Sequence, residues 1–381
     1  MRAFVFTDKA LSKHAGQFVW LSIDTEKAQN AEFIKKYPIR AWPSLYVIDP
    51  RKETILLRWV GAADVPRLEK LLAEGRRDYG GEAGPKGADL ARADRLYGEG
   101  KYAESVPAYR AALKTIPETD PRWARASESL LFALSATRQR ADCAALALET
   151  YPKLRGTLTG ADFAAGGLDC ALALPADAKD RAESVARMEA AARESLADAK
   201  IPLAADDRSA LYGSLFDARE DAKDAAGAAA VAKEWVADLD ARAARAATAE
   251  QRTSMDPNRL SAYDAAGQLE RAIPMLERSE REFPKDYNPP ARLALVYQRL
   301  GRWDEALAAD DRALKLVYGP RRIRVLLVRA DIYKGKGDAA MQKKTLEDAV
   351  AFAKSLPEGQ RSDGDVADLE KRVSAVKVGG P

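Results

Sequence analysis

A glycine recurs at nearly constant spacing in the last third of the chain. Gly267 and Gly301 are 34 residues apart, and Gly337 follows after another 36. A tyrosine stands four residues before each of these glycines, and small or apolar residues follow at matching positions. A period of this length accommodates two helices and a turn, and one helix pair cannot bury its apolar face alone. We therefore expect neighbouring pairs to stack into a helical solenoid with a continuous core.

This period and its small and aromatic positions resemble the tetratricopeptide repeat. A further unit is centred on Gly100 and closes at Pro117, and Pro152 follows 35 residues later. Helices with degenerate spacing are expected between these units, at residues 162–173, 177–199, 208–223 and 226–247. The resemblance implies that the concave face binds extended peptides, and it places the following residues at groove-facing positions: Asn288, Arg292, Gln298, Arg324 and Lys334. A solvated charged face is the other interpretation of these residues.

The first 75 residues have a different character. Strands are predicted at residues 18–24, 45–48 and 53–60, and helices at residues 30–37 and 64–72. Asp64 is a plausible cap for the second helix, with Pro66 in its first turn. Pro43 precedes the apolar run from Leu45, and a proline is tolerated at the first residue of a strand because it cannot donate to the ladder.

This order of elements, together with Trp42, Pro43 and Gly61–Ala62, resembles the C-terminal two-thirds of a thioredoxin fold. The resemblance implies that Pro43 follows a cis peptide bond and that Trp42 offers backbone groups to an extended substrate strand. In that family a Cys-x-x-Cys turn and the helix it opens precede the strand that matches residues 18–24. Here Met1 falls inside that helix, so residues 2–8 match its remainder and the cysteine pair is missing. We therefore expect a start assigned too late, or a fragment of a longer protein.

Composition excludes several classes of function. The chain has 61 basic and 58 acidic residues, and this balance argues against a nucleic-acid or membrane-surface partner. His14 is the sole histidine, and Cys143 and Cys170 form no Cys-x-x-Cys, so no metal centre, cofactor or Ser-His-Asp triad is expected. Buried packing is the expected role of both cysteines. There is no apolar run of transmembrane length and no signal peptide, which places the chain as written in the cytoplasm. A truncated start would instead allow a periplasmic or other extracytoplasmic location.

The predicted fold is thus predominantly helical, with an α/β thioredoxin-like N-terminal segment and an all-α solenoid of the tetratricopeptide type. The expected boundaries are 1–75 for the partial head, 76–87 for a glycine-rich linker, 88–356 for the repeats and 357–381 for a capping helix and tail. The main functional hypothesis is a protein-interaction scaffold that binds protein or peptide partners and is redox-inactive as given, with no catalytic residue. The alternative is a thiol-disulfide oxidoreductase or redox chaperone whose cysteine pair lies upstream, because this exchange requires a thiolate.

Overall fold

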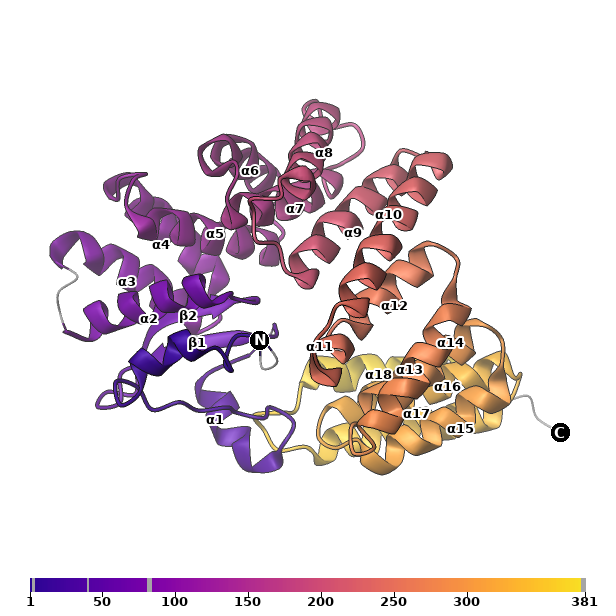
Figure 1. Cartoon of the computed structure of the whole chain (residues 1–381). Coiled ribbons are helices and arrows are strands. Elements are labelled where there is room, and N and C mark those ends of the chain that lie inside the picture. Colours follow the sequence, from indigo (N-terminus) through magenta and orange to yellow (C-terminus); the bar gives the residue numbers. More distant parts are fainter. Residues whose placement is uncertain (2–3, 40, 81–83, 378–381) are drawn as a thin grey trace. The chain divides into compact units, whose positions relative to one another are not determined.

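The computed structural model describes residues 1, 4–39, 41–80 and 84–377. Contacts divide the chain into two compact units (Figure 1). Unit 1 consists of Met1–Phe18 and Pro38–Ala246, and unit 2 consists of Val19–Tyr37 and Ala247–Pro381. Unit 2 therefore combines the C-terminal part of the chain with a short segment from near its beginning. The two units are described separately below.

A small antiparallel hairpin lies near the start of unit 1. β1 (Ser44–Ile48) pairs with β2 (Ile55–Val60), and these are the strands that the described residues contain. η1 (Lys9–His14) and α2 (Val65–Gly80) pack against the hairpin around Leu57, Trp59 and Leu68. The predicted cap of α2 is confirmed, because the backbone N–H of Arg67 donates to Asp64 Oδ1 over 2.8 Å. The Trp42–Pro43 peptide bond is cis, as the resemblance implied.

Two local predictions for this region are corrected by the structure. Residues 18–24 form no strand, and Val19 and Leu21 remain 86% and 68% exposed. A strand needs a hydrogen-bonded neighbour, and residues 18–24 pair with no strand of the described chain. Residues 76–80 continue α2 and residues 84–87 begin α3 (Gly84–Gly98), so most of the predicted linker is helical. The helix expected at residues 30–37 is the short α1 (Ala31–Lys36), which belongs to unit 2.

The hairpin and α2 share buried polar contacts with the first helices of unit 1. Arg58 of β2 is fully buried, and its Nη1 donates to the carbonyl of Tyr97 and the hydroxyl of Tyr102, each over 3.0 Å. Arg125 is also buried, and its guanidinium binds Glu74 of α2 at 2.6 Å and Asp94 of α3 at 2.7 Å. These contacts cross the predicted boundary between head and repeats, so the two parts share one packed interior.

The rest of unit 1 consists of helices packed against their sequence neighbours (Figure 1). They are α4 (Tyr102–Thr115), α5 (Pro121–Ala136), α6 (Arg140–Leu154), α7 (Leu158–Leu172), α8 (Arg181–Ala197), α9 (Ala205–Asp221) and α10 (Ala225–Ala244). Four of these match the helices predicted with degenerate spacing. Cys143 of α6 and Cys170 of α7 are buried as predicted, but they also form a disulfide, which sequence analysis did not foresee.

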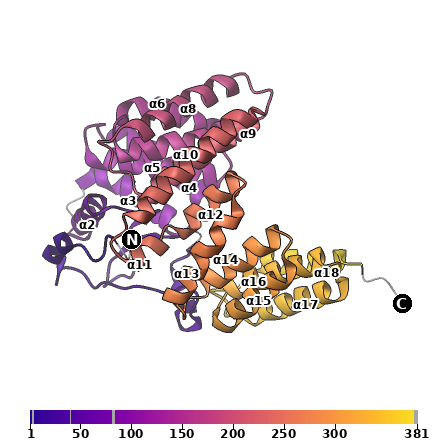
Figure 2. The same cartoon turned by 45° about the vertical axis from the view of Figure 1, so that its right-hand side comes forward.

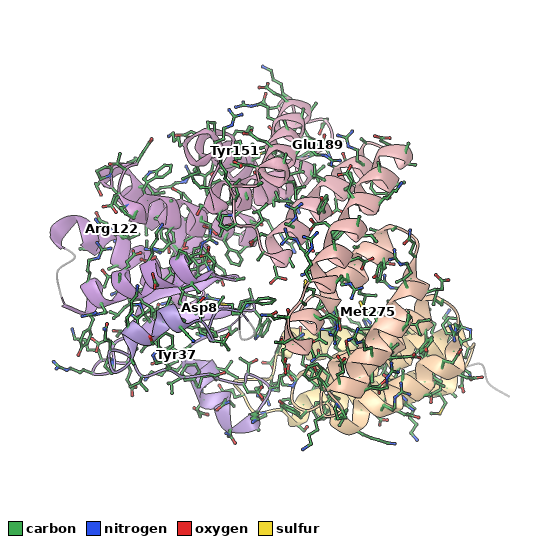
Figure 3. All side chains as sticks on the ribbon, viewed as in Figure 1. Asp8, Tyr37, Arg122, Tyr151, Glu189 and Met275 are labelled. Carbon is green, nitrogen blue, oxygen red and sulfur yellow. A yellow bond between two sulfur atoms is a disulfide. The ribbon has the colours of Figure 1, made fainter. Side chains whose placement is uncertain are left out.

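Unit 2 contains the helix pairs with the regular period (Figure 2). After η2 (Ala28–Asn30) and α1, it comprises α11 (Ala249–Thr253), α12 (Asp256–Ala265), η3 (Leu269–Arg271), α13 (Ala272–Glu282), α14 (Asn288–Arg299), α15 (Trp303–Leu316), α16 (Arg321–Gly335), α17 (Ala339–Ser355) and α18 (Asp363–Ala375). Small side chains such as Ala306 and Ala309 are fully buried where the helices meet. Met275 of α13, labelled in Figure 3, is buried as well.

One turn geometry recurs in both units. In six helix pairs a backbone N–H donates to the carbonyl five residues earlier, as in the bond from Arg302 to Tyr297. This bond closes around a residue in the left-handed region, which is Gly100, Gly267, Gly301 or Gly337 in four pairs. Arg138 and Lys223 occupy the same position in the other two, with φ of 58° and 55°. The weak repeat signal in the middle of the chain therefore conceals the same turn built without glycine.

Candidate functional site

The candidate site is the face of unit 2 that carries Arg292 on α14 and Arg324 on α16. Arg292 is half-buried, whereas Arg324 is exposed. Neither guanidinium makes an ion pair or hydrogen bond with the described residues, although most arginines of this unit are paired. The structure thus brings together two predicted groove residues from consecutive repeats.

Electrostatics distinguish Arg292 from the other arginines of unit 2. Burial lowers its pKa, and the nearby charge of Arg324 lowers it further. Asp256 and Asp286 act in the opposite direction but do not restore the ordinary value. Removing a guanidinium from water without a paired anion is unfavourable. Arg292 therefore lies in an environment that an added anion would stabilise.

Asp256 is a neighbour of Arg292 that sequence analysis missed. This first residue of α12 is 1% exposed, and its Oδ2 accepts a hydrogen bond of 2.6 Å from the Ser279 hydroxyl. Its Oδ1 has no hydrogen-bond partner among the described residues. Burial raises the pKa of Asp256, while Ser279, Arg259 and Arg292 lower it. The Asp256 carboxylate offsets part of the positive charge of Arg292 through space, but it accepts no hydrogen bond from the guanidinium.

The other predicted groove residues lie elsewhere on the same helices. Asn288 begins α14 and uses its side-chain amide to bind Asp286 Oδ1 at 2.7 Å. Gln298 follows Arg292 by six residues, about 9 Å along the helix axis, and Lys334 follows Arg324 by ten, about 15 Å. The arginine pair is therefore the compact part of the predicted set.

The predicted substrate-contacting loop is in unit 1. Trp42 is 57% exposed, and the carbonyl of Pro43 accepts a hydrogen bond of 2.9 Å from the N–H of Gly61. This bond joins the two ends of the hairpin, so the Pro43 carbonyl is used within the head.

A second polar cluster in unit 1 was not predicted. Arg67 of α2 binds Asp162 Oδ2 at 2.9 Å and the Thr159 hydroxyl at 3.2 Å, and it lies 3.8 Å from Glu128 Oε2. Burial and the neighbouring Asp162 raise the pKa of Glu128, while Arg67 lowers it. These residues come from α2, α5 and α7, so the cluster fastens the head to the helices. Residues this far apart in sequence give no local signal of such a cluster.

Neither a metal site nor a membrane span is found in the described part of the chain. No group of three or more histidine, cysteine, aspartate or glutamate side chains there is arranged to hold a metal ion. None of its helices combines the length and the apolar character that crossing a bilayer requires.

Comparison with known proteins identifies one repeat. The family model described as "Tetratricopeptide repeat" matches residues 291–324, a segment that contains both Arg292 and Arg324. No curated protein matches the chain. A solved tetratricopeptide repeat protein from Parabacteroides merdae is 9% identical, with 76% of this chain and 98% of that chain covered and a TM-score of 0.46. A complex of the TPR2AB domain of yeast Sti1 with pHSP90 is 14% identical, with 77% and 99% covered and a TM-score of 0.27.

Proposed function

We propose that this chain is a protein-interaction scaffold whose C-terminal repeats bind acidic peptide segments through Arg292 and Arg324. The observation that carries this proposal is the unpaired, partly desolvated guanidinium of Arg292 beside a second unpaired arginine. A carboxylate accepts two parallel hydrogen bonds from one guanidinium, which makes arginine well suited to side-chain and C-terminal carboxylates. The tetratricopeptide match over residues 291–324 supports a role in protein binding.

The test uses a fluorescein-labelled, glutamate-rich decapeptide with a free C-terminal carboxylate. Fluorescence polarisation would compare the full chain with the double variant Arg292→Ala/Arg324→Ala at low and moderate salt. Loss of two charge-assisted contacts at about 1.5 kcal/mol each corresponds to a loss of affinity of roughly 100-fold, and the remaining binding should depend less on salt. Amidating the peptide terminus tests whether the terminal carboxylate is among the groups bound.

Arg312→Ala is the matched control. Arg312 lies on α15 of the same repeat and is bound to Glu280 at 2.7 Å, so its charge is already neutralised. Its removal should leave peptide affinity nearly unchanged. Equal affinities for wild type and the Arg292/Arg324 double variant would reject the proposal. The double variant should not melt at a lower temperature, because it removes a guanidinium that burial disfavours.

We also propose that the head is a thioredoxin-like segment that serves as a docking platform. The antiparallel pairing of β1 with β2 and the packing of α2 against both strands support this assignment. Both cysteines of the sequence are joined to each other in α6 and α7, so the oxidised chain as given offers no thiolate for exchange. For the residues of this sequence, the observation supports a redox-inactive scaffold. The disulfide also favours an extracytoplasmic location over the cytoplasmic one, because disulfides persist mainly in oxidising compartments.

A further inference from the structure

A segment from near the start of the chain is bound to the C-terminal repeats of unit 2. This segment, residues 24–36, is called the strap. The Asp24 carboxylate accepts a hydrogen bond of 2.7 Å from the Tyr318 hydroxyl, and the carbonyl of Thr25 accepts one of 2.8 Å from the Gln360 side chain. Near its other end, Lys35 pairs with Glu358 at 2.8 Å, and the chain leaves unit 2 after Tyr37, labelled in Figure 3. The strap therefore contacts loops that precede α16 and α18.

Two glycines let the strap backbone approach these loops closely. A Cβ added to Gly319 would lie 2.0 Å from the carbonyl oxygen of Glu26. One added to Gly359 would lie 2.0 Å from the carbonyl oxygen of Ala31. Contacts of this length are impossible for any side chain. The strap is thus seated on the repeats backbone to backbone, at positions where the sequence has glycine.

Glu26 contacts residues at the starts of α14 and α16, the helices that carry Arg292 and Arg324. Its carboxylate accepts hydrogen bonds from the Tyr287 hydroxyl at 2.9 and 3.1 Å and from Arg321 Nε at 3.1 Å. Tyr287 is also among the groups that raise the pKa of Arg292. Arg321 precedes Arg324 by three residues on α16, so the two side chains lie on neighbouring parts of one helix face. The surface that carries Arg292, Arg321 and Arg324 is called the arginine face. An acidic side chain of this chain thus occupies the Arg321 end of this face.

We infer that the strap is an intramolecular acidic segment that competes with acidic partners for the arginine face of unit 2. The inference rests on the proposed function of Arg292 and Arg324. An acidic peptide bound to these arginines can extend to Arg321 only after Glu26 leaves it. The occupant of this surface in the free protein is therefore the Asp24–Glu26 part of the strap, and the partner that displaces it is a second acidic segment.

The main test measures binding of the same glutamate-rich peptide to Glu26→Gln in the full chain. Glutamine keeps the size of the side chain but removes the charge that holds Arg321. We expect affinity for the peptide to rise 3- to 10-fold, in keeping with the loss of one partly exposed ion pair. Glu32→Gln is the matched control, because Glu32 is an exposed strap residue in α1, and its affinity should equal that of wild type.

A second variant displaces the strap by its backbone. Gly319→Ala introduces the clash with Glu26, whereas Gly267→Ala has a similar positive φ of 64° with nothing within 4 Å of the added Cβ. Hydrogen exchange of residues 24–36 should become faster in Gly319→Ala and not in Gly267→Ala. Peptide affinity should rise in Gly319→Ala alone.

The outcomes separate the two proposals. Unchanged peptide binding in Arg292→Ala/Arg324→Ala rejects the proposed function. If the double variant loses affinity as expected but Glu26→Gln binds the peptide as wild type does or more weakly, the proposed competition is wrong. The strap would then have only a structural role. Unchanged exchange of the strap in Gly319→Ala also overturns the inference, because it shows that the seat on Gly319 is not required.

Discussion

Asp310 is a fully buried carboxyl in the interface between repeats, and its replacement should change how stability depends on pH. The preceding and following repeats have Leu276 and Leu346 at the matching positions, both buried. Asp310 Oδ2 accepts a hydrogen bond of 3.0 Å from Arg329, while Oδ1 has no partner among the described residues. Burial raises the pKa of Asp310 to about 7, and the attraction of Arg329 offsets this only in part. Asp311 raises it further, and Arg322 lowers it.

The sign and size of the effect follow from proton linkage. An unfolded aspartate loses its proton near pH 3.9, whereas Asp310 in the folded state keeps it up to about pH 7. The folded state therefore binds more protons between these values, and the free energy of unfolding falls as the pH rises. The ionisation of Asp310 lowers the free energy of unfolding by about 4 kcal/mol in total as the pH rises. About 2.5 kcal/mol of this loss falls between pH 5 and pH 8.

Asp310→Leu restores the residue type of the neighbouring repeats and removes this titration. Arg329 keeps an ion pair of 2.7 Å with Asp311, so its charge is not left unpaired. Native-state hydrogen exchange of amides in α15 and α16 would report the free energy of opening at pH 5 and pH 8, compared between variant and wild type at each pH. The stability of the variant relative to wild type should increase by about 2.5 kcal/mol between these two pH values.

Asp310→Asn is the control, because it keeps an acceptor for Arg329 without a titrating group. It should show the same change with pH as the leucine variant, whatever its absolute stability. A difference between wild type and both variants that is equal at pH 5 and pH 8 would refute the reasoning. It would mean that Asp310 is ionised across this range and that Arg329 compensates its burial fully.

Two further predictions concern unit 1. The variant Cys143→Ser/Cys170→Ser should lose about 3.5 kcal/mol, the loop-closure value for cysteines 27 residues apart, and dithiothreitol should lower the melting temperature of wild type but not of this variant. Two free thiols in the unreduced protein would contradict the pairing. Glu74→Ala should cost about 3 kcal/mol, because it leaves the buried Arg125 with one carboxylate partner. Glu69→Ala is the control, because it removes a largely exposed ion pair with Lys13 and should change the free energy of unfolding by less than about 1 kcal/mol. A loss in Glu74→Ala as small as that in the control would show that Arg125 needs no second partner.

The sequence predicts the elements whose causes are local. Asp64 and Pro66 mark the start of α2, and the turn glycines mark the regular helix pairs. Arg138 and Lys223 adopt the same turn conformation without glycine. The glycine period is therefore absent from the sequence at these positions, although the helix pairs have the same turn. The left-handed conformation costs a non-glycine residue only about 1 to 2 kcal/mol. The remaining contacts of the turn can compensate this cost.

Non-local contacts account for the features that the sequence did not predict. The apolar residues from Phe18 suggest a strand, but they pair with no strand among the described residues. The carboxylates that follow bind tyrosines and an arginine that lie 261 to 295 residues away in the sequence. The pairing of Cys143 with Cys170 depends on how α6 packs against α7, which spacing alone does not specify. In the candidate site, residue type and period indicated Arg292 and Arg324, whereas the buried Asp256 beside them required the packed structure.

Unit 2 is built from two segments that are far apart in the sequence, and this affects the order in which the chain can fold during synthesis. Thr25 emerges early, but Gln360, which binds its carbonyl, is made 335 residues later. At translation rates of about 5 to 20 residues per second this interval is about 17 to 67 s. During that time the parts of unit 1 on either side of residues 19–37 can pack together while this segment remains an undocked loop. The nascent chain therefore carries an undocked strap until the last repeats appear and bind it.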